Sequence, residues 1–191
     1  MASATARVEE DSAFILDAIR TRALRTDGPF KLGSGGTSPY YLDIRILLND
    51  VRVLSGIARL ILAKVPPGTN AVGGLATSSI PISTAIMILD ERHRKGQPAL
   101  RGFWIRSEEK LHGVGGQLCG ELHRGERVVV VDDVTTKGNS VLKVVKVVRE
   151  FGADVTKIVS VVDRVEGAAE IFSQHKIPFD PLFSVKEILD T

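Results

Sequence analysis

The stretch from Val128 to Ser140 reads VVVVDDVTTKGNS. Its four consecutive valines form a short, wholly apolar, β-branched run, which is typical of a strand buried on both faces of a parallel sheet. Two carboxylates, Asp132 and Asp133, follow the valines, and a polar loop that contains Gly138 comes next. We therefore expect an α/β fold in which this strand is central.

The segment after the loop is amphipathic and predicts a helix. Its apolar and polar positions are Val141, Leu142, Val144, Val145 and Val148 against Lys143, Lys146, Arg149 and Glu150. A strand, a loop and a helix N-terminus together bind anions, because free backbone N–H groups and the helix dipole point to one place. Carboxylates beside such a place accept hydrogen bonds from sugar hydroxyls or help to hold a divalent metal. The pattern indicates a phosphorylated polyhydroxy ligand, although aspartates that merely cap the helix are an equally open interpretation of the residues alone.

Length and composition set the class of protein. The chain has 191 residues, 43% of them hydrophobic and 25% charged, which predicts one soluble globular domain. A net charge of +2 gives no reason to expect nucleic acid as a partner. No apolar run approaches the roughly 20 residues of a membrane span, and the N-terminal residues lack a signal core. The single cysteine, Cys119, excludes an internal disulfide; we interpret it as structural and expect a cytoplasmic protein.

Periodicity predicts the remaining elements. Residues 1–8 read as a weakly ordered lead and residues 107–116 as a polar, mobile surface loop. The expected helices span about 9–25, 51–64, 81–94 and 168–175, and the expected strands span 71–75, 101–106, 155–163 and 178–185, with a hairpin of two short strands within 30–45.

Four segments resemble known motifs. Val128 to Ser140 resembles the phosphoribosyl pyrophosphate (PRPP) loop of type I phosphoribosyltransferases. Phe30 to Arg45 (FKLGSGGTSPYYLDIR) resembles the N-terminal signature of orotate phosphoribosyltransferases, Arg106 to Gly116 (RSEEKLHGVGG) their loop of the form RKExKxHGxGG, and Asp163 to Ala168 (DRVEGA) their DRxEGA segment. Taken singly, the last three also fit a solvated hairpin, a loop without a role and a surface salt bridge. The four motifs follow the family's order from Phe30 to the C-terminus.

The resemblance implies a fold and a reaction. The implied fold is a twisted, mostly parallel sheet flanked by helices, in a single domain over 1–191. Its core would span about 46–175, under a small hood made from about 1–45 and the C-terminal tail. The implied reaction joins PRPP and orotate to give orotidine 5′-phosphate and pyrophosphate, with Mg²⁺, in pyrimidine nucleotide synthesis. The family implies a homodimer in which the mobile loop of one subunit completes the neighbour's site.

The resemblance also assigns residues. It implies catalytic roles for Lys110, His112, Asp132 and Asp133. It places orotate against Thr136 and Arg164. Mg²⁺ would be held mainly through PRPP and water, with no firm protein ligand. The implied PRPP-binding residues are Arg106, Lys110, His112, Asp132, Asp133, Val134, Thr135, Thr136, Lys137, Gly138, Asn139 and Ser140.

Three positions depart from the family pattern. Gly33, Ser78 and Ser107 stand where many members have lysine. A charge-assisted contact to phosphate contributes roughly 1.5–3 kcal/mol, so these losses predict weaker PRPP binding or turnover unless Lys31 or Lys137 compensates. Two alternatives therefore stay open: a transferase for another base, which would have no use for Arg164, and a PRPP-binding regulator with weakened catalysis.

Overall fold

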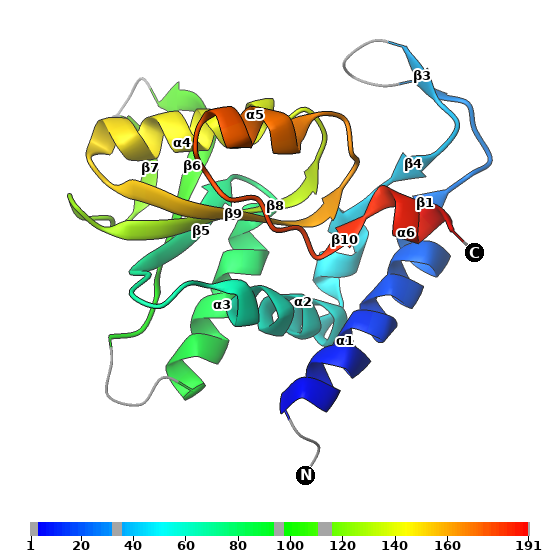
Figure 1. Cartoon of the computed structure of the whole chain (residues 1–191), viewed down its shortest axis with the longest axis horizontal. Helices are drawn as coiled ribbons and strands as arrows, with labels where there is room; N and C mark the ends of the chain where they lie inside the picture. The colour runs from blue at the N-terminus through cyan, green and yellow to red at the C-terminus, as the bar shows by residue number, and fades with distance from the viewer. Residues whose placement is uncertain (1–3, 32–35, 94–97, 111–115, 191) are drawn as a thin grey trace.

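A parallel sheet forms the centre of the computed structural model, which describes residues 4–31, 36–93, 98–110 and 116–190. In that part of the chain, six strands form one sheet in the order β10-β9-β8-β5-β6-β7, parallel except for β7 (Figure 1). Their bounds are β5 Ala71–Leu75, β6 Arg101–Lys110, β7 Gly116–Gly120, β8 Arg127–Thr135, β9 Asp154–Asp163 and β10 Phe183–Ser184. The expected α/β class with a mostly parallel sheet is confirmed.

Helices cover both faces of this sheet. Helices α4 and α5 lie over one face, and α2 and α3 lie over the other, with α1 beside α2 (Figure 1). The helices are α1 Ala4–Ala18, α2 Val51–Lys64, α3 Ser79–His93, α4 Asn139–Phe151, α5 Ala168–Gln174 and α6 Val185–Leu189, with a π-helical turn at Ile19–Ala23 and a 3₁₀ turn at Ile44–Asn49. The bounds predicted for α2 and β5 agree with the structure.

The four valines of β8 are fully buried, as their sequence predicts. Val129 and Val131 point into the core that contains α2 and α3, whereas Val128 and Val130 point into the core on the α4 side. Alternate side chains therefore join both hydrophobic cores, which fixes β8 at the centre of the sheet.

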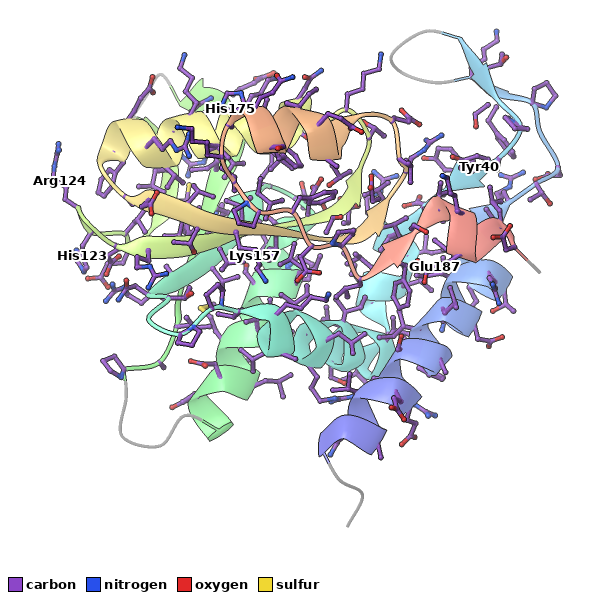
Figure 2. The ribbon with its side chains drawn as sticks, in the orientation of Figure 1. Tyr40, His123, Arg124, Lys157, His175 and Glu187 are labelled. Carbon is purple, nitrogen blue, oxygen red and sulfur yellow. The ribbon has the colours of Figure 1, made fainter. Side chains whose placement is uncertain are left out.

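The π-helical turn after α1 contacts the C-terminal helix α6 and the residue that follows it. The guanidinium of Arg20 donates hydrogen bonds to the carbonyl oxygens of Glu187, Ile188 and Asp190 at 2.5, 3.2 and 2.6 Å. Two short ribbons lie beside this contact: β1 Leu24–Arg25 pairs with β4 Tyr41–Leu42, and β2 Phe30–Lys31 pairs with β3 Thr37–Ser38. Figure 2 shows Tyr40 and Glu187 on this side of the molecule.

Local patterns misplaced the ends of several elements. The first helix begins at Ala4, so the weakly ordered lead predicted for residues 1–8 is wrong for residues 4–8. Strand β8 runs through both aspartates to Thr135 instead of stopping before them, because its pairing with β9 continues to Asp163. That pairing involves a distant segment and is invisible in the local pattern.

The loop predicted at 107–116 is wrong for residues 107–110 and 116, which lie in strands; residues 111–115 lie outside the described residues. Strand β6 continues to Lys110, and the unpredicted β7 returns beside it, pairing Cys119 with Trp104. The strand predicted at 178–185 shrinks to Phe183–Ser184 and an isolated bridge from Phe179 to Ile158. No helix within the described ranges is long and apolar enough to span a membrane.

Candidate active site

A cavity of about 380 Å³ opens where β5 and β8 end. The residues that line it come from three segments: the stretch around β4, the loop after β5, and the end of β8 with the loop that follows. They are Tyr41, Leu42, Asp43, Arg45, Thr77, Ser78, Asp133, Val134 and Thr136. The cavity lies outside the carboxyl ends of the parallel strands, where ligands bind in open α/β sheets.

Asp132 is the buried member of the carboxylate pair, with 7% of its surface exposed. Its Oδ2 accepts a hydrogen bond from Thr135 Oγ1 at 2.9 Å. Burial, together with the charge of Asp133, raises the pKa of Asp132 to about 7. Asp132 can therefore take up or release a proton near neutral pH.

Asp133 is the member that faces the cavity. Its Oδ1 accepts a hydrogen bond from Ser78 Oγ at 2.8 Å, across 55 residues of sequence. Gly74 makes this approach possible, because a Cβ there would lie 2.1 Å from the Val131 carbonyl oxygen and 2.8 Å from Ser79 Cβ. Only glycine lets the ends of β5 and β8 approach so closely.

The loop after β8 leads into α4, and most of its polar side chains are exposed. Gly138 precedes the helix in the left-handed region at φ 78°, and no side chain caps the helix. Thr136, Lys137 and Asn139 are exposed, as is Ser140. The alternative in which the aspartates merely cap the helix is therefore wrong, and the N-terminal N–H groups of α4 are available to an anion.

Arg164 joins the site from the end of β9. Its backbone N–H donates to the Thr135 carbonyl oxygen at 2.9 Å, and its guanidinium lies 4.8 Å from the centre of the Tyr40 ring. Its Nε is 3.0 Å from Glu166 Oε1, in the ion pair that the alternative interpretation expected, yet only 10% of the side chain is exposed. The arginine is thus largely buried, whereas Glu166 is exposed, and the ion pair that the alternative expected is present.

The residues predicted from the RSEEKLHGVGG motif do not line the main cavity in the described part of the chain. Arg106 is half-buried at the edge of a separate cavity of about 200 Å³, which Ser107, Lys143 and Lys146 also line. The backbone of Lys110 ends β6. His112 and Gly33 lie outside the described residues.

Sequence reasoning did not assign roles to Asp43, Arg45 or Ser78, all of which line the cavity. Arg45 Nε donates to Asp43 Oδ1 at 2.8 Å, and this hydrogen bond holds the pKa of Asp43 below its usual range despite partial burial. The alternation of polar Tyr41, Asp43 and Arg45 with apolar Leu42 and Ile44 was the available signal, since Leu42 and Ile44 are buried.

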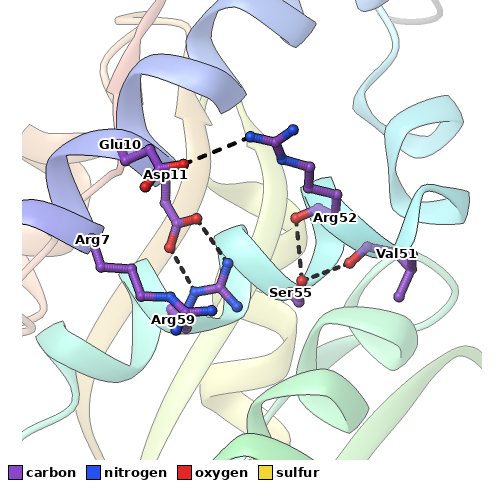
Figure 3. Close-up of a pocket in the computed structure, with 7 residues that line it drawn as sticks. All are labelled: Arg7, Glu10, Asp11, Val51, Arg52, Ser55 and Arg59. Atoms are coloured by element: carbon purple, nitrogen blue, oxygen red, sulfur yellow. Dashed lines mark hydrogen bonds and ion pairs between the residues drawn. The ribbon is translucent and has the colours of Figure 1, made fainter. Parts of the chain in front are cut away.

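A larger cavity of about 510 Å³ lies between α1 and α2, away from these residues (Figure 3). On its wall, Arg59 donates to both carboxylate oxygens of Asp11 at 2.6 and 2.7 Å, and Arg52 lies 3.8 Å from Glu10. These contacts join two packed helices, so we assign this cavity a structural origin.

Comparisons with known proteins agree with this geometry. A family model described as phosphoribosyl transferase domain matches residues 93–181. The orotate phosphoribosyltransferase of Methanocaldococcus jannaschii is 38% identical over 164 residues, which cover 86% of this chain and 89% of the relative. The chain belongs to the orotate phosphoribosyltransferase family. The family's enzyme from Aquifex aeolicus is 39% identical and covers 90% of this chain and 93% of its own.

Solved structures of family members have the same fold. The Aeropyrum pernix orotate phosphoribosyltransferase superposes with a TM-score of 0.75 at 32% identity, covering 94% of this chain and 96% of its own. The Mycobacterium tuberculosis H37Rv orotate phosphoribosyltransferase in complex with PRPP superposes with a TM-score of 0.73 at 29% identity. The match covers 93% of this chain and 98% of the M. tuberculosis chain. The resemblance inferred from the four sequence motifs is thereby confirmed.

Proposed function

We propose that this protein transfers the phosphoribosyl group of PRPP to orotate, giving orotidine 5′-phosphate and pyrophosphate in pyrimidine nucleotide synthesis. The observation that carries this proposal is the pair Asp132 and Asp133, placed between the cavity and the open N-terminus of α4. A helix N-terminus that could bind a phosphate and a carboxylate that could bind sugar hydroxyls thus lie side by side, which supports PRPP as the ligand.

The phosphate end of PRPP fits the loop after β8. Backbone N–H groups at the start of α4 and the hydroxyls of Thr135, Thr136 and Ser140 would hold the 5′-phosphate, with Val134, Lys137, Gly138 and Asn139 completing the loop. Asp133, on the cavity wall, would accept hydrogen bonds from the ribose hydroxyls. Asp132 would lie behind it, near the positive charge that develops on the sugar as pyrophosphate leaves.

Orotate fits beside Arg164. Its guanidinium offers parallel N–H donors to a carboxylate, and Thr136 lies on the wall of the same cavity as Tyr41. Lys110 and His112 from the β6–β7 hairpin, with Arg106, would neutralise the departing pyrophosphate as the loop closes and excludes water.

Mg²⁺ fits this site as a partner of the substrate. The described residues contain no cluster of three or more potential metal ligands, whereas Asp133 offers one carboxylate at the cavity. When bound, Mg²⁺ would neutralise negative charge on the pyrophosphate and keep several waters. We further propose a cytoplasmic homodimer, with residues 1–45 and the C-terminal tail as a hood over the site.

The direct test is orotate consumption, followed by absorbance, with purified protein, PRPP and Mg²⁺. We expect loss of orotate that requires all three and yields orotidine 5′-phosphate. PRPP binding by calorimetry without consumption of orotate would refute the proposal. Uracil and the purine bases, tested under the same conditions, would then separate a transferase for another base from a PRPP-binding regulator.

A further inference from the structure

The loop after β5 contains a serine where many family members have lysine. Ser78 is half-buried and lies on the wall of the cavity, and its hydroxyl points to Asp133 with a donor–acceptor distance of 2.8 Å. A lysine at this position would offer a positive charge to a phosphate group. The serine instead makes a hydrogen bond with a carboxylate of the site.

The position of Ser78 is fixed by its surroundings. Its neighbour Ser79 is fully buried and donates from Oγ to the Leu75 carbonyl oxygen at 2.6 Å. The backbone N–H of Ala76 donates to the Ile105 carbonyl oxygen at 2.8 Å, which fastens the start of the loop to β6. A hydroxyl held by such a frame is preorganised, so it restricts the carboxylate that it contacts.

The contact restricts one oxygen of Asp133. Oδ1 accepts the Ser78 hydrogen bond, and the described residues supply no donor to Oδ2. Arg45 lies on the wall of the same cavity, and the negative charge of Asp133 contributes to raising the Arg45 pKa, after the larger effects of Asp43. Asp133 thus has one oxygen anchored on the β5 side and one left for a ligand.

We propose that Ser78 is a positioning residue that holds the Asp133 carboxylate in the orientation in which its second oxygen receives the ribose hydroxyls of PRPP. This inference rests on the proposed function only for the identity of the ligand. A neutral residue at this position would thus support PRPP binding through the ribose, which Asp133 contacts, and not through the phosphates.

The test is a double-mutant cycle on PRPP binding, measured by calorimetry with Mg²⁺ in the full chain. A hydrogen bond to a charged group typically changes an equilibrium by a factor of ten or more, so Ser78→Ala is expected to weaken PRPP binding about tenfold. Ser78→Thr, which keeps the hydroxyl, is expected to stay within about threefold of the wild type. In an Asp133→Ala background, Ser78→Ala should have almost no further effect, because its partner is gone.

Steady-state kinetics supply a second readout. Ser78→Ala should raise KM for PRPP about tenfold while KM for orotate stays within about twofold. The matched control is Ser83→Ala, a buried serine on α3 whose hydroxyl donates only to the carbonyl oxygens of Ser79 and Ile80. It should lower stability without changing PRPP binding.

Several outcomes would overturn the inference. Equal effects of Ser78→Ala with and without Asp133 would show that Ser78 acts independently of that carboxylate. Failure of Ser78→Thr to retain binding would assign the effect to packing. If the wild type binds PRPP but does not consume orotate, the proposed function fails and the cycle still decides the role of Ser78. If the wild type does not bind PRPP, both proposals fail.

Discussion

Asp132 is buried beside a second carboxylate, and this placement makes the stability of the protein depend on pH. Its folded-state pKa of about 7 lies well above the ordinary value of an aspartate, so the folded protein binds this proton more tightly than the unfolded chain does. The stabilising contribution of the protonated form is complete below about pH 4 and is lost as the pH rises through 7.

We therefore expect Asp132→Asn, which cannot ionise and can still accept the Thr135 hydrogen bond, to be more stable than the wild type at pH 8. The expected gain is roughly 2–4 kcal/mol in the free energy of unfolding, and it should shrink between pH 8 and pH 5. Urea denaturation at both pH values measures it, with activity lost at the same time. A gain of the same size at both pH values would contradict this account.

Arg164 makes a second prediction at the scale of single residues. Arg164→Lys keeps the charge but loses the planar pair of donors, so kcat/KM for orotate should fall roughly 10- to 100-fold. KM for PRPP should change little, because Arg164 is assigned to the base. Steady-state kinetics with each substrate varied in turn measure both values.

Arg124→Lys is the matched control, since Arg124 lies at the far end of the molecule from Tyr40 (Figure 2). It should leave both kinetic constants unchanged. An equal loss for PRPP and orotate in Arg164→Lys would assign Arg164 to the general architecture of the site.

The sequence predicts many site residues but not their mutual contacts. Asp132, Asp133 and Arg164 were predicted from motifs, and the structure brings the ends of their two strands together. The hydrogen bond from Ser78 to Asp133 was not predictable, because it joins residues 55 positions apart through sheet geometry. By sequence alone, Ser78 stands out only as a serine where many family members have lysine.

At the scale of elements, the closest approach in the site depends on β5. A Cβ on Gly74 would lie 2.1 Å from the Val131 carbonyl oxygen, a backbone atom that cannot move away without displacing β8. Gly74→Ala should therefore destabilise the protein by about 1–3 kcal/mol, and it should weaken PRPP binding by separating Ser78 from Asp133. Chemical denaturation and calorimetry measure the two effects.

Gly56→Ala in α2 provides the comparison. Its nearest contact would be the flexible end of Ile15 at 3.0 Å, and alanine favours a helix. Stability should change much less there, and PRPP binding should not change. Gly74→Ala with wild-type stability would mean that β5 and β8 can separate without cost.

Apolar runs predicted the central elements because burial on two faces leaves a strong local signature. Strand β7 escaped prediction because its sequence, GQLCG, has glycine at both ends and only two apolar residues. It is a strand only because β6 offers it an edge to pair with. The first helix was likewise placed too late because its exposed beginning lacks an apolar stripe.

At the scale of the whole molecule, the position of the β6–β7 hairpin bears on the assembly. Gly73 pairs with both Val130 and Phe103, so Ile105 on β6 is about level with Asp132 on β8. Lys110 comes five residues after Ile105 on the same strand, which places its backbone about 16 Å beyond the aspartates if the strand is straight. Strand β5 also lies between β6 and β8. This distance agrees with the proposed homodimer, in which Lys110 would serve the site of the neighbouring subunit.

This geometry predicts complementation between two inactive variants. Lys110→Ala should lose most turnover while keeping its fold, and Asp133→Ala should lose turnover through the ribose site. If the hairpin of one subunit completes the partner's site, a mixed dimer contains one site that carries both mutations and one site that carries neither. Equal mixtures with full exchange put half of the chains in mixed dimers, so activity should recover to about one quarter of the wild-type value.

Each variant mixed with itself is the control, and light scattering before and after mixing reports the oligomeric state. Recovery that rises with the time allowed for exchange would identify the dimer as the active unit and place Lys110 across the interface. A dimer that exchanges subunits without recovery would mean that the hairpin folds back over its own chain. In that case Lys110 and Asp133 would belong to one subunit, and the 16 Å separation would have to be closed by bending β6 near the register shift that lies between Ile105 and Lys110.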